Sequence, residues 1–151
     1  MPITSEIINE VDSLIATDKN NVANMANLSA HLFEKGGWHW AGFYLVDESR
    51  DELVLGPFQG PVACTRLKKG EGVCAKSWVE NSTVYVPNVH KFSGHIACSV
   101  KSNSEVVIPI RVGDKVKAVL DIDSEMFDGF SKEEIDILES VVTKLESQWE
   151  G

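Results

Sequence analysis

Cysteines are few in this sequence and none form a close pair, which weakens the case for a structural metal site. Nine residues separate Cys64 from Cys74, and 23 separate Cys74 from Cys98. Structural zinc normally uses closely spaced ligand pairs such as C-x2-C. We therefore expect no metal, with zinc held by these cysteines together with His90 and His95 as the weaker alternative.

Long apolar runs and export signals are also missing. No apolar stretch approaches the roughly 20 residues that a membrane-spanning helix needs. The N-terminal segment lacks the basic patch and apolar run of a signal peptide. We therefore expect a cytoplasmic protein with no membrane partner. Thiols are kept reduced in the cytosol, so a disulfide there is more often catalytic or regulatory than structural.

Positive charge is scarce: 14 Lys and Arg face 23 Asp and Glu, for a net charge of −9. Nucleic acids and anionic membranes need clustered basic residues, so neither is an expected partner. The one basic cluster, Arg66, Lys68 and Lys69, stands beside Glu71. It indicates a solvated strand end rather than a phosphate-binding patch.

The sequence does contain enough apolar residues, 43%, to fill one core, and its 151 residues suit one domain. Helical spacing is expected at 5–16, 20–37 and 130–149, and a short helix within 70–82. Two apolar stripes define the first pair of helices: Ile7, Ile8, Val11, Leu14 and Ile15, then Val22, Met25, Ala26, Leu32 and Phe33. The last helix shows a stripe of Ile135, Leu138, Val142, Leu145 and Trp149, after a capping box of Ser131 and Glu134.

Strand-like segments lie between these helices. They cover 38–47, 51–60, 63–70 and 83–89, followed by two strands around a Gly113-Asp114 turn within 105–124. Short connections between successive strands imply antiparallel pairing. The sequence therefore predicts an α+β fold, a mostly antiparallel sheet of about six strands with the N- and C-terminal helices packed on it.

The cysteines occupy suggestive contexts. Cys74 lies in GEGVCAK and Cys98 in GHIACSVKSN, at loop or loop-to-helix positions. Backbone N–H groups at such turns can lower the pKa of a thiol, and thiols that meet suit a redox cycle. The alternative is that the cysteines are small buried hydrophobic residues.

Carboxylates and aromatic residues also gather on predicted strand faces. Asp121 and Asp123 are two residues apart on one strand face, and Glu105 opens the preceding strand. Such a group could bind an ammonium or hold a proton for donation, with Trp40 and Tyr44 as an apolar wall. The alternatives are a wet strand end for the carboxylates and plain core packing for the aromatic residues.

Six short strings occur in order along the chain: WAGFYL, LVLGPFQGPVAC, GEGVC, GHIAC, SNSEVVIPI and VLDIDS. Together, from about Trp38 to Phe130, they resemble the free methionine-(R)-sulfoxide reductases, which are single-domain GAF proteins. The resemblance implies that residues 1–151 form a single GAF domain with a mostly antiparallel sheet.

The resemblance also implies roles for individual residues. Cys98 falls on the family's nucleophile, Cys64 on its resolving cysteine, and Cys74 on a cysteine that can also take part in disulfide formation. The substrate-binding positions fall on Trp40, Tyr44, Glu105, Asp121 and Asp123.

By resemblance, then, the expected reaction is the reduction of free L-methionine (R)-S-oxide to L-methionine. It would pass through a cysteine sulfenic acid and an intramolecular disulfide, which a thioredoxin-like partner reduces. No cofactor is implied, and the family is often a homodimer. A non-catalytic GAF sensor of small ligands and a thiol redox switch without a substrate remain alternative functions.

Overall fold

The structure is a computed structural model that describes residues 3–15, 17–94 and 101–151. Its helices are α1 (Glu6–Ile15), α2 (Asn21–Gly36), α3 (Gly72–Glu80) and α4 (Lys132–Gln148), with a short 3-10 helix η1 (Val89–Lys91). Its strands are β1 (Trp40–Asp47), β2 (Glu52–Gln59), β3 (Arg66–Lys68), β4 (Val84–Val86), β5 (Ser104–Val112) and β6 (Lys115–Ser124).

The described strands form one sheet in the order β3-β2-β1-β6-β5-β4, in which every neighbouring pair is antiparallel. This confirms the predicted α+β fold with six strands. Strands β1 and β6 lie in the middle, and each edge of the sheet is a strand of three residues. The site-forming strands are therefore the ones with a hydrogen-bonded neighbour on both sides.

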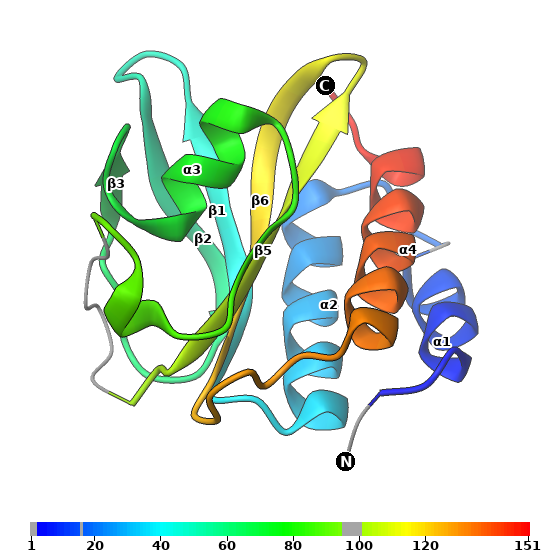
Figure 1. The fold of residues 1–151 in the computed structure, drawn as a ribbon. Helices are drawn as coiled ribbons and strands as arrows, with labels where there is room; N and C mark the ends of the chain where they lie inside the picture. Colours follow the sequence, from blue (N-terminus) through cyan, green and yellow to red (C-terminus); the bar gives the residue numbers. More distant parts are fainter. Residues whose placement is uncertain (1–2, 16, 95–100) are drawn as a thin grey trace.

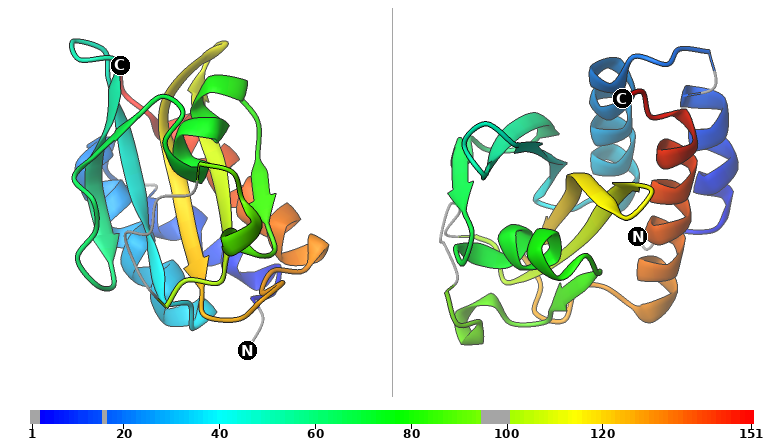
Figure 2. Two further views of the ribbon diagram at one scale, coloured as in Figure 1. Left: turned by 60° about the vertical axis from the view of Figure 1, so that its left-hand side comes forward. Right: turned by 90° about the horizontal axis from the view of Figure 1, so that it is seen from above.

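Helices cover the two faces of the sheet unequally. α1, α2 and α4 pack together on one face, while α3 and the segment around η1 lie on the other (Figures 1 and 2). Because side chains alternate along a strand, β1 serves both layers. Ala41 and Phe43 join the core under the terminal helices, whereas Trp40 and Tyr44 join the core under α3.

The predicted start of the last helix is confirmed. Ser131 accepts a hydrogen bond from the backbone N–H of Glu134, whose carboxylate accepts from the N–H of Ser131, closing the capping box. The buried stripe of α4 is wider than predicted, since it includes Ile137 and Val141. Ile135 and Trp149 lie at its partly buried border.

The stripe predicted for α2 is partly wrong. Val22 and Ala26 are exposed, whereas Leu28 is fully buried. Two polar residues occupy the buried face instead: Asn24 donates to the carbonyl of Asp18, and Ser29 donates to the carbonyl of Met25. Their satisfied hydrogen bonds make this burial tolerable, and apolar spacing alone does not detect them.

Among the residues that the structure describes, no helix combines the length and the apolar character that crossing a membrane would require.

Candidate active site

Three carboxylic acids meet where β5 begins and β6 ends. Glu105 of β5 lies directly opposite Asp123 of β6 in the strand register, and Asp121 lies two residues before Asp123 on the same face. Glu105 and Asp121 are buried and Asp123 is partly buried. The alternative of a merely wet strand end does not hold for Glu105 and Asp121, which are 8% and 5% exposed.

The pairing of β1 with β6 brings the aromatic residues to the same face. Trp40 lies opposite Asp123, and Gly42 lies opposite Asp121. The rings of Trp40 and Tyr44 are stacked with their centroids 6.1 Å apart, and Phe58 of β2 also stacks on Trp40, at 5.1 Å. The aromatic wall therefore lies next to the cluster of three carboxyls, as predicted, and has Phe58 as a third member.

The polar ends of the aromatic wall hold the segment that carries Cys64. The indole N–H of Trp40 donates to the carbonyl of Pro61 at 3.0 Å. The hydroxyl of Tyr44 donates to the carbonyl of Cys64 at 2.8 Å. These two bonds are more than core packing needs, because they tie the loop before β3 to the strand face that bears the carboxyl group.

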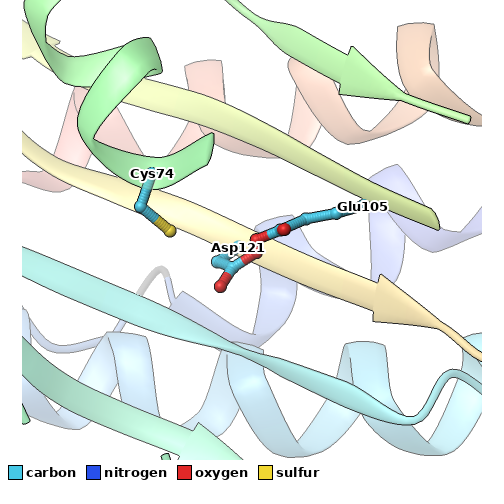
Figure 3. A group of neighbouring side chains, drawn as sticks. All are labelled: Cys74, Glu105 and Asp121. Carbon is cyan, nitrogen blue, oxygen red and sulfur yellow. The ribbon is translucent and has the colours of Figure 1, made fainter. Parts of the chain in front are cut away.

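Cys74 lies in the first turn of α3, and its sulfur points toward the carboxyls of Glu105 and Asp121 (Figure 3). The Cys74 Sγ and one carboxylate oxygen each of Glu105 and Asp121 all lie within 4.8 Å of one another. Cys74 is also 3% exposed. The alternative prediction, a small buried residue, is therefore correct about the burial of Cys74. The residues that face its sulfur, however, are acidic rather than apolar.

The expectation that the context of Cys74 favours its thiolate is wrong. Burial raises the pKa of this thiol well above its usual range, and the negative charges of Asp121 and Glu105 raise it further. The turn at the start of α3 does not offset these effects. Cys74 is therefore held as a neutral thiol.

The carboxyl pKa values are all raised. Burial raises the pKa of Glu105 well above its usual range, and repulsion from Asp121 and Asp123 adds to this. Burial likewise raises the pKa of Asp123, with Asp121 as the next cause, and raises the pKa of Asp121 against contacts with Glu105 and Cys74 that lower it. Like charges this close cannot all ionise cheaply, so the group retains at least one proton near neutral pH.

Within the described residues, the negative charge of this group has no ion-pair partner. No ion pair between residues in 3–15, 17–94 and 101–151 involves Glu105, Asp121 or Asp123. Within the same part of the chain, Asp121 Oδ1 and Asp123 Oδ1 are buried without a hydrogen-bond partner. An unpaired buried carboxylate oxygen is costly, which indicates a place for a cationic ligand.

The three cysteines differ in state. Cys64 is disulfide-bonded, Cys74 carries a free thiol, and Cys98 lies outside the described residues. The zinc alternative drew on two histidines as well. His90 Nε2 is hydrogen-bonded to Asn103 Oδ1 at 2.8 Å, and His95 also lies outside the described residues. Because two of the five suggested ligands lie outside the described residues, the structure does not test the zinc alternative.

Two residues of this site were missed in the sequence. Phe58 stacks on Trp40, and Gly42 provides the space for that stack, because a methyl group there would overlap Phe58 and the Trp40 ring. The alternation of β1 places Gly42 between Trp40 and Tyr44, and the hairpin pairs Gly42 with Phe58. That hairpin was predicted, so its register is the signal that could have located both residues.

The geometry combines a cation-accepting acidic group, a proton source and an apolar wall. A ligand with an ammonium at one end and a small apolar group at the other matches these features. A proton held among Glu105, Asp121 and Asp123 can be donated to an oxygen that leaves the ligand.

Comparison with known proteins adds three findings. The GAF domain family model matches residues 20–147. GAF domain-containing protein A of Dictyostelium discoideum is 46% identical, with 83% of this chain and 79% of the relative covered. The free methionine-R-sulfoxide reductase of Escherichia coli is 42% identical, with 94% and 86% covered.

Solved structures agree with the sequence relatives. The X-ray structure of free methionine-R-sulfoxide reductase from Neisseria meningitidis in complex with its substrate superimposes with a TM-score of 0.93 at 44% identity. The match covers 95% of this chain and 86% of that one. The six-stranded fold described above is thus a GAF fold.

Proposed function

We propose that this chain, which belongs to the GAF domain family and within it to the free methionine-R-sulfoxide reductases, reduces free methionine-(R)-sulfoxide to methionine using its own thiols. The observation that carries the proposal is the buried cluster of three carboxyls beside an aromatic wall. The segment that carries Cys64 is hydrogen-bonded to the same wall. The family's relatives supply the identity of the substrate.

The substrate's α-ammonium would supply positive charge to the three carboxyls. Glu105, Asp121 and Asp123 offer carboxylate oxygens, two of which lack partners in the described part of the chain. A methionine residue inside a polypeptide has an amide nitrogen instead of an ammonium, so it cannot provide the positive charge. We therefore propose that the enzyme prefers the free amino acid over peptide-bound methionine sulfoxide.

The apolar end of the substrate would rest against the aromatic wall. Trp40 and Tyr44 are 3% and 2% exposed, and Phe58 backs Trp40. A methyl group bound to sulfur is small and polarisable, and sulfur packs favourably against aromatic rings. With the ammonium fixed at the carboxyl group, this contact orients the sulfoxide.

The chemical step begins with the thiolate of Cys98, which attacks the sulfoxide sulfur. A carboxyl of the acidic group donates a proton to the sulfoxide oxygen. The oxygen passes to Cys98, which becomes a sulfenic acid, and methionine leaves with its sulfur reduced. Cys98 is thus oxidised by two electrons, and no metal or organic cofactor takes part.

Recycling uses a second thiol. The thiol of Cys64 attacks the sulfenic acid, releases water and forms a disulfide. Cys64 is disulfide-bonded in the structure, which supports this role. A thioredoxin-like dithiol then reopens the disulfide by exchange. The cytosol supplies such reductants, so we propose cytoplasmic location.

For Cys74 we propose a different role from that of a first resolving cysteine. Its thiol is buried, its pKa is raised, and its sulfur faces Asp121 rather than solvent. A neutral thiol attacks a sulfenic acid slowly, because the thiolate is the nucleophile. Cys74 therefore serves mainly to hold Asp121, and it acts as a resolving thiol only after α3 has moved.

The direct experiment incubates reduced protein with free methionine-(R)-sulfoxide and measures methionine by amino-acid analysis. We expect one methionine per protein without reductant, and continued turnover with thioredoxin. A Cys98→Ser variant should release none, and an N-acetylated, amidated sulfoxide should react poorly. Absence of methionine would leave a ligand sensor, and disulfide formation without methionine would leave a thiol switch.

A further inference from the structure

Cys74, Glu105 and Asp121 form a cluster of three ligand atoms contributed by α3, β5 and β6 (Figure 3). One atom from each residue lies within 4.8 Å of the other two, and the three residues are 3%, 8% and 5% exposed. The cluster mixes one sulfur with two carboxylate oxygens. It differs from the ligand set of cysteines and histidines that the sequence suggested.

A second observation points to a cation at this cluster. Asp121 is more than nine-tenths buried, and its Oδ1 has no hydrogen-bond partner in 3–15, 17–94 and 101–151. No ion pair between the described residues reaches Glu105 or Asp121. Within those residues, the cluster therefore buries acidic groups without a positive partner, which an incoming ion would provide.

We propose that Cys74, Glu105 and Asp121 bind a borderline-soft divalent cation of the Zn²⁺ class, and that this ion excludes the ammonium of the substrate. Zinc takes thiolate and carboxylate ligands at about 2.3 Å and about 2.0–2.2 Å, which puts two ligands of one tetrahedral ion about 3.5 Å apart. Atoms already within 4.8 Å need to move by only about 1 Å to reach that geometry.

The donor set selects among cations. A thiolate favours Zn²⁺ over Mg²⁺ and Ca²⁺, which prefer oxygen ligands. Ca²⁺ takes about 6–8 oxygen ligands, and this cluster offers oxygens from only two residues. Three protein ligands leave a fourth tetrahedral position open for water. The thiol proton of Cys74 is released when the metal–sulfur bond forms.

Competition with the substrate follows from shared ligands, and this part alone rests on the proposed function. Glu105 and Asp121 cannot hold a metal ion and an ammonium at the same oxygens. The ion is thus an inhibitor of the reductase rather than its cofactor. Metal binding itself does not require that the chain reduce any sulfoxide.

The test isolates Cys74 by removing the other two cysteines. In a full-length Cys64→Ser/Cys98→Ser chain, Cys74 is the sole cysteine of the three in the sequence. Co²⁺ is the probe, because a cobalt–thiolate bond gives a charge-transfer absorption band. We expect one equivalent of Co²⁺ to produce this band and one equivalent of Zn²⁺ to abolish it. Absence of the band overturns the site.

Matched variants in the same background test the two oxygen ligands. Asp121→Asn and Glu105→Gln should each weaken binding by at least about tenfold, as loss of a direct ligand must exceed the effect of outer contacts. Asp123→Asn is the control, since it removes a neighbouring charge outside the three-ligand set. Equal losses for Asp121→Asn and Asp123→Asn would mean diffuse attraction and would overturn the site.

Two further measurements remain decisive if a variant folds poorly. Zn²⁺ should raise the Tm of the sole-cysteine chain, because a ligand of the native state stabilises it. The same ion should leave the Tm of Cys74→Ser in that background unchanged, and an equal rise in both chains would overturn the thiolate ligand. Free methionine-(R)-sulfoxide should lower the intensity of the cobalt–thiolate band by competing for Glu105 and Asp121, whereas its N-acetylated form should not.

The outcomes separate the two proposals. Methionine formation without a cobalt band would overturn the metal site and leave the reductase. A cobalt–thiolate band whose intensity free methionine-(R)-sulfoxide leaves unchanged would overturn the claim that the metal ion and the substrate share one pocket. If the cobalt band appears and the variants weaken it as expected, but the wild-type protein forms no methionine, the metal site is supported and the proposed function is contradicted.

Discussion

Glu105 lies directly opposite Asp123 in the antiparallel pairing of β5 with β6. Like charges at directly opposed positions destabilise a sheet, and burial here makes the repulsion harder for solvent to screen. The pair is thus unfavourable for folding, and its presence at the site fits a function that requires concentrated negative charge.

The first prediction concerns stability. Asp123→Asn should raise the free energy of unfolding near neutral pH by about 0.5–1 kcal/mol, because it removes a carboxyl whose pKa is raised in the folded state and which therefore costs stability near neutral pH, whether it ionises or holds a proton. Urea titration of wild type and variant measures the difference. Asp114→Asn, in the exposed Gly113-Asp114 turn, makes the same charge change elsewhere and should have little effect.

The advantage of Asp123→Asn should also depend on pH. A carboxyl whose pKa is raised in the folded state binds more protons there than in the unfolded chain, so stability falls as pH rises. The loss begins above about pH 4, where the unfolded carboxyl ionises, and is complete above the raised folded pKa. An advantage that shrinks as pH rises from about 4 toward neutrality would contradict this assignment.

The second prediction concerns the chemical step. Asp123→Asn should lower the single-turnover rate at saturating substrate by roughly 100- to 10,000-fold, because an amide cannot donate a proton as a positioned acid does. Rapid-quench measurement of methionine across pH gives the rate. A normal saturated rate with a higher KM would place the proton donor at Glu105 or Asp121, and would leave Asp123 as an ammonium ligand.

The third prediction separates reduction from recycling. Cys64→Ser should release one methionine at a rate near that of wild type, and then turn over slowly with thioredoxin. The reason is that Cys64 acts after methionine has left. A dimedone adduct, which reports sulfenic acid, should accumulate in the variant. Undiminished thioredoxin-driven turnover would instead assign the resolving role to Cys74.

The fourth prediction addresses the aromatic wall. Gly42→Ala should raise KM, because a methyl group there overlaps Phe58 and the ring of Trp40 and must displace their stack. Steady-state kinetics measure the change. Gly56→Ala is the matched control in the adjacent strand, where an added methyl would meet the Phe43 carbonyl and the Leu45 side chain at 3.2–3.5 Å. A KM that rises equally in both variants would indicate general loosening of the sheet.

Local geometry explains what the sequence could predict about this site. The two-residue period of a strand fixes Asp121 and Asp123 on one face, and the Gly113-Asp114 turn brings Glu105 to the same end. Six strands, the capping box and the terminal helices follow from equally local patterns. These parts depend on neighbours in the chain and were predicted.

Long-range pairing explains what the sequence could not predict. Trp40 adjoins Asp123 only because β1 pairs with β6, which is distant in the chain. The environment of Cys74 likewise depends on α3 packing over β5 and β6. Its helical turn favoured a thiolate, yet burial, and next to it the carboxylates of distant strands, raise the pKa of this thiol instead.

The short strands at both sheet edges restrict how two copies of this chain could associate. β3 and β4 have three residues each, so a copy added in register would gain few backbone hydrogen bonds. Short edges of this kind oppose continuation of a sheet across molecules. A homodimer, where one forms, would thus be built from side chains on the helices or loops. The two sheets would not join edge to edge into one continuous sheet.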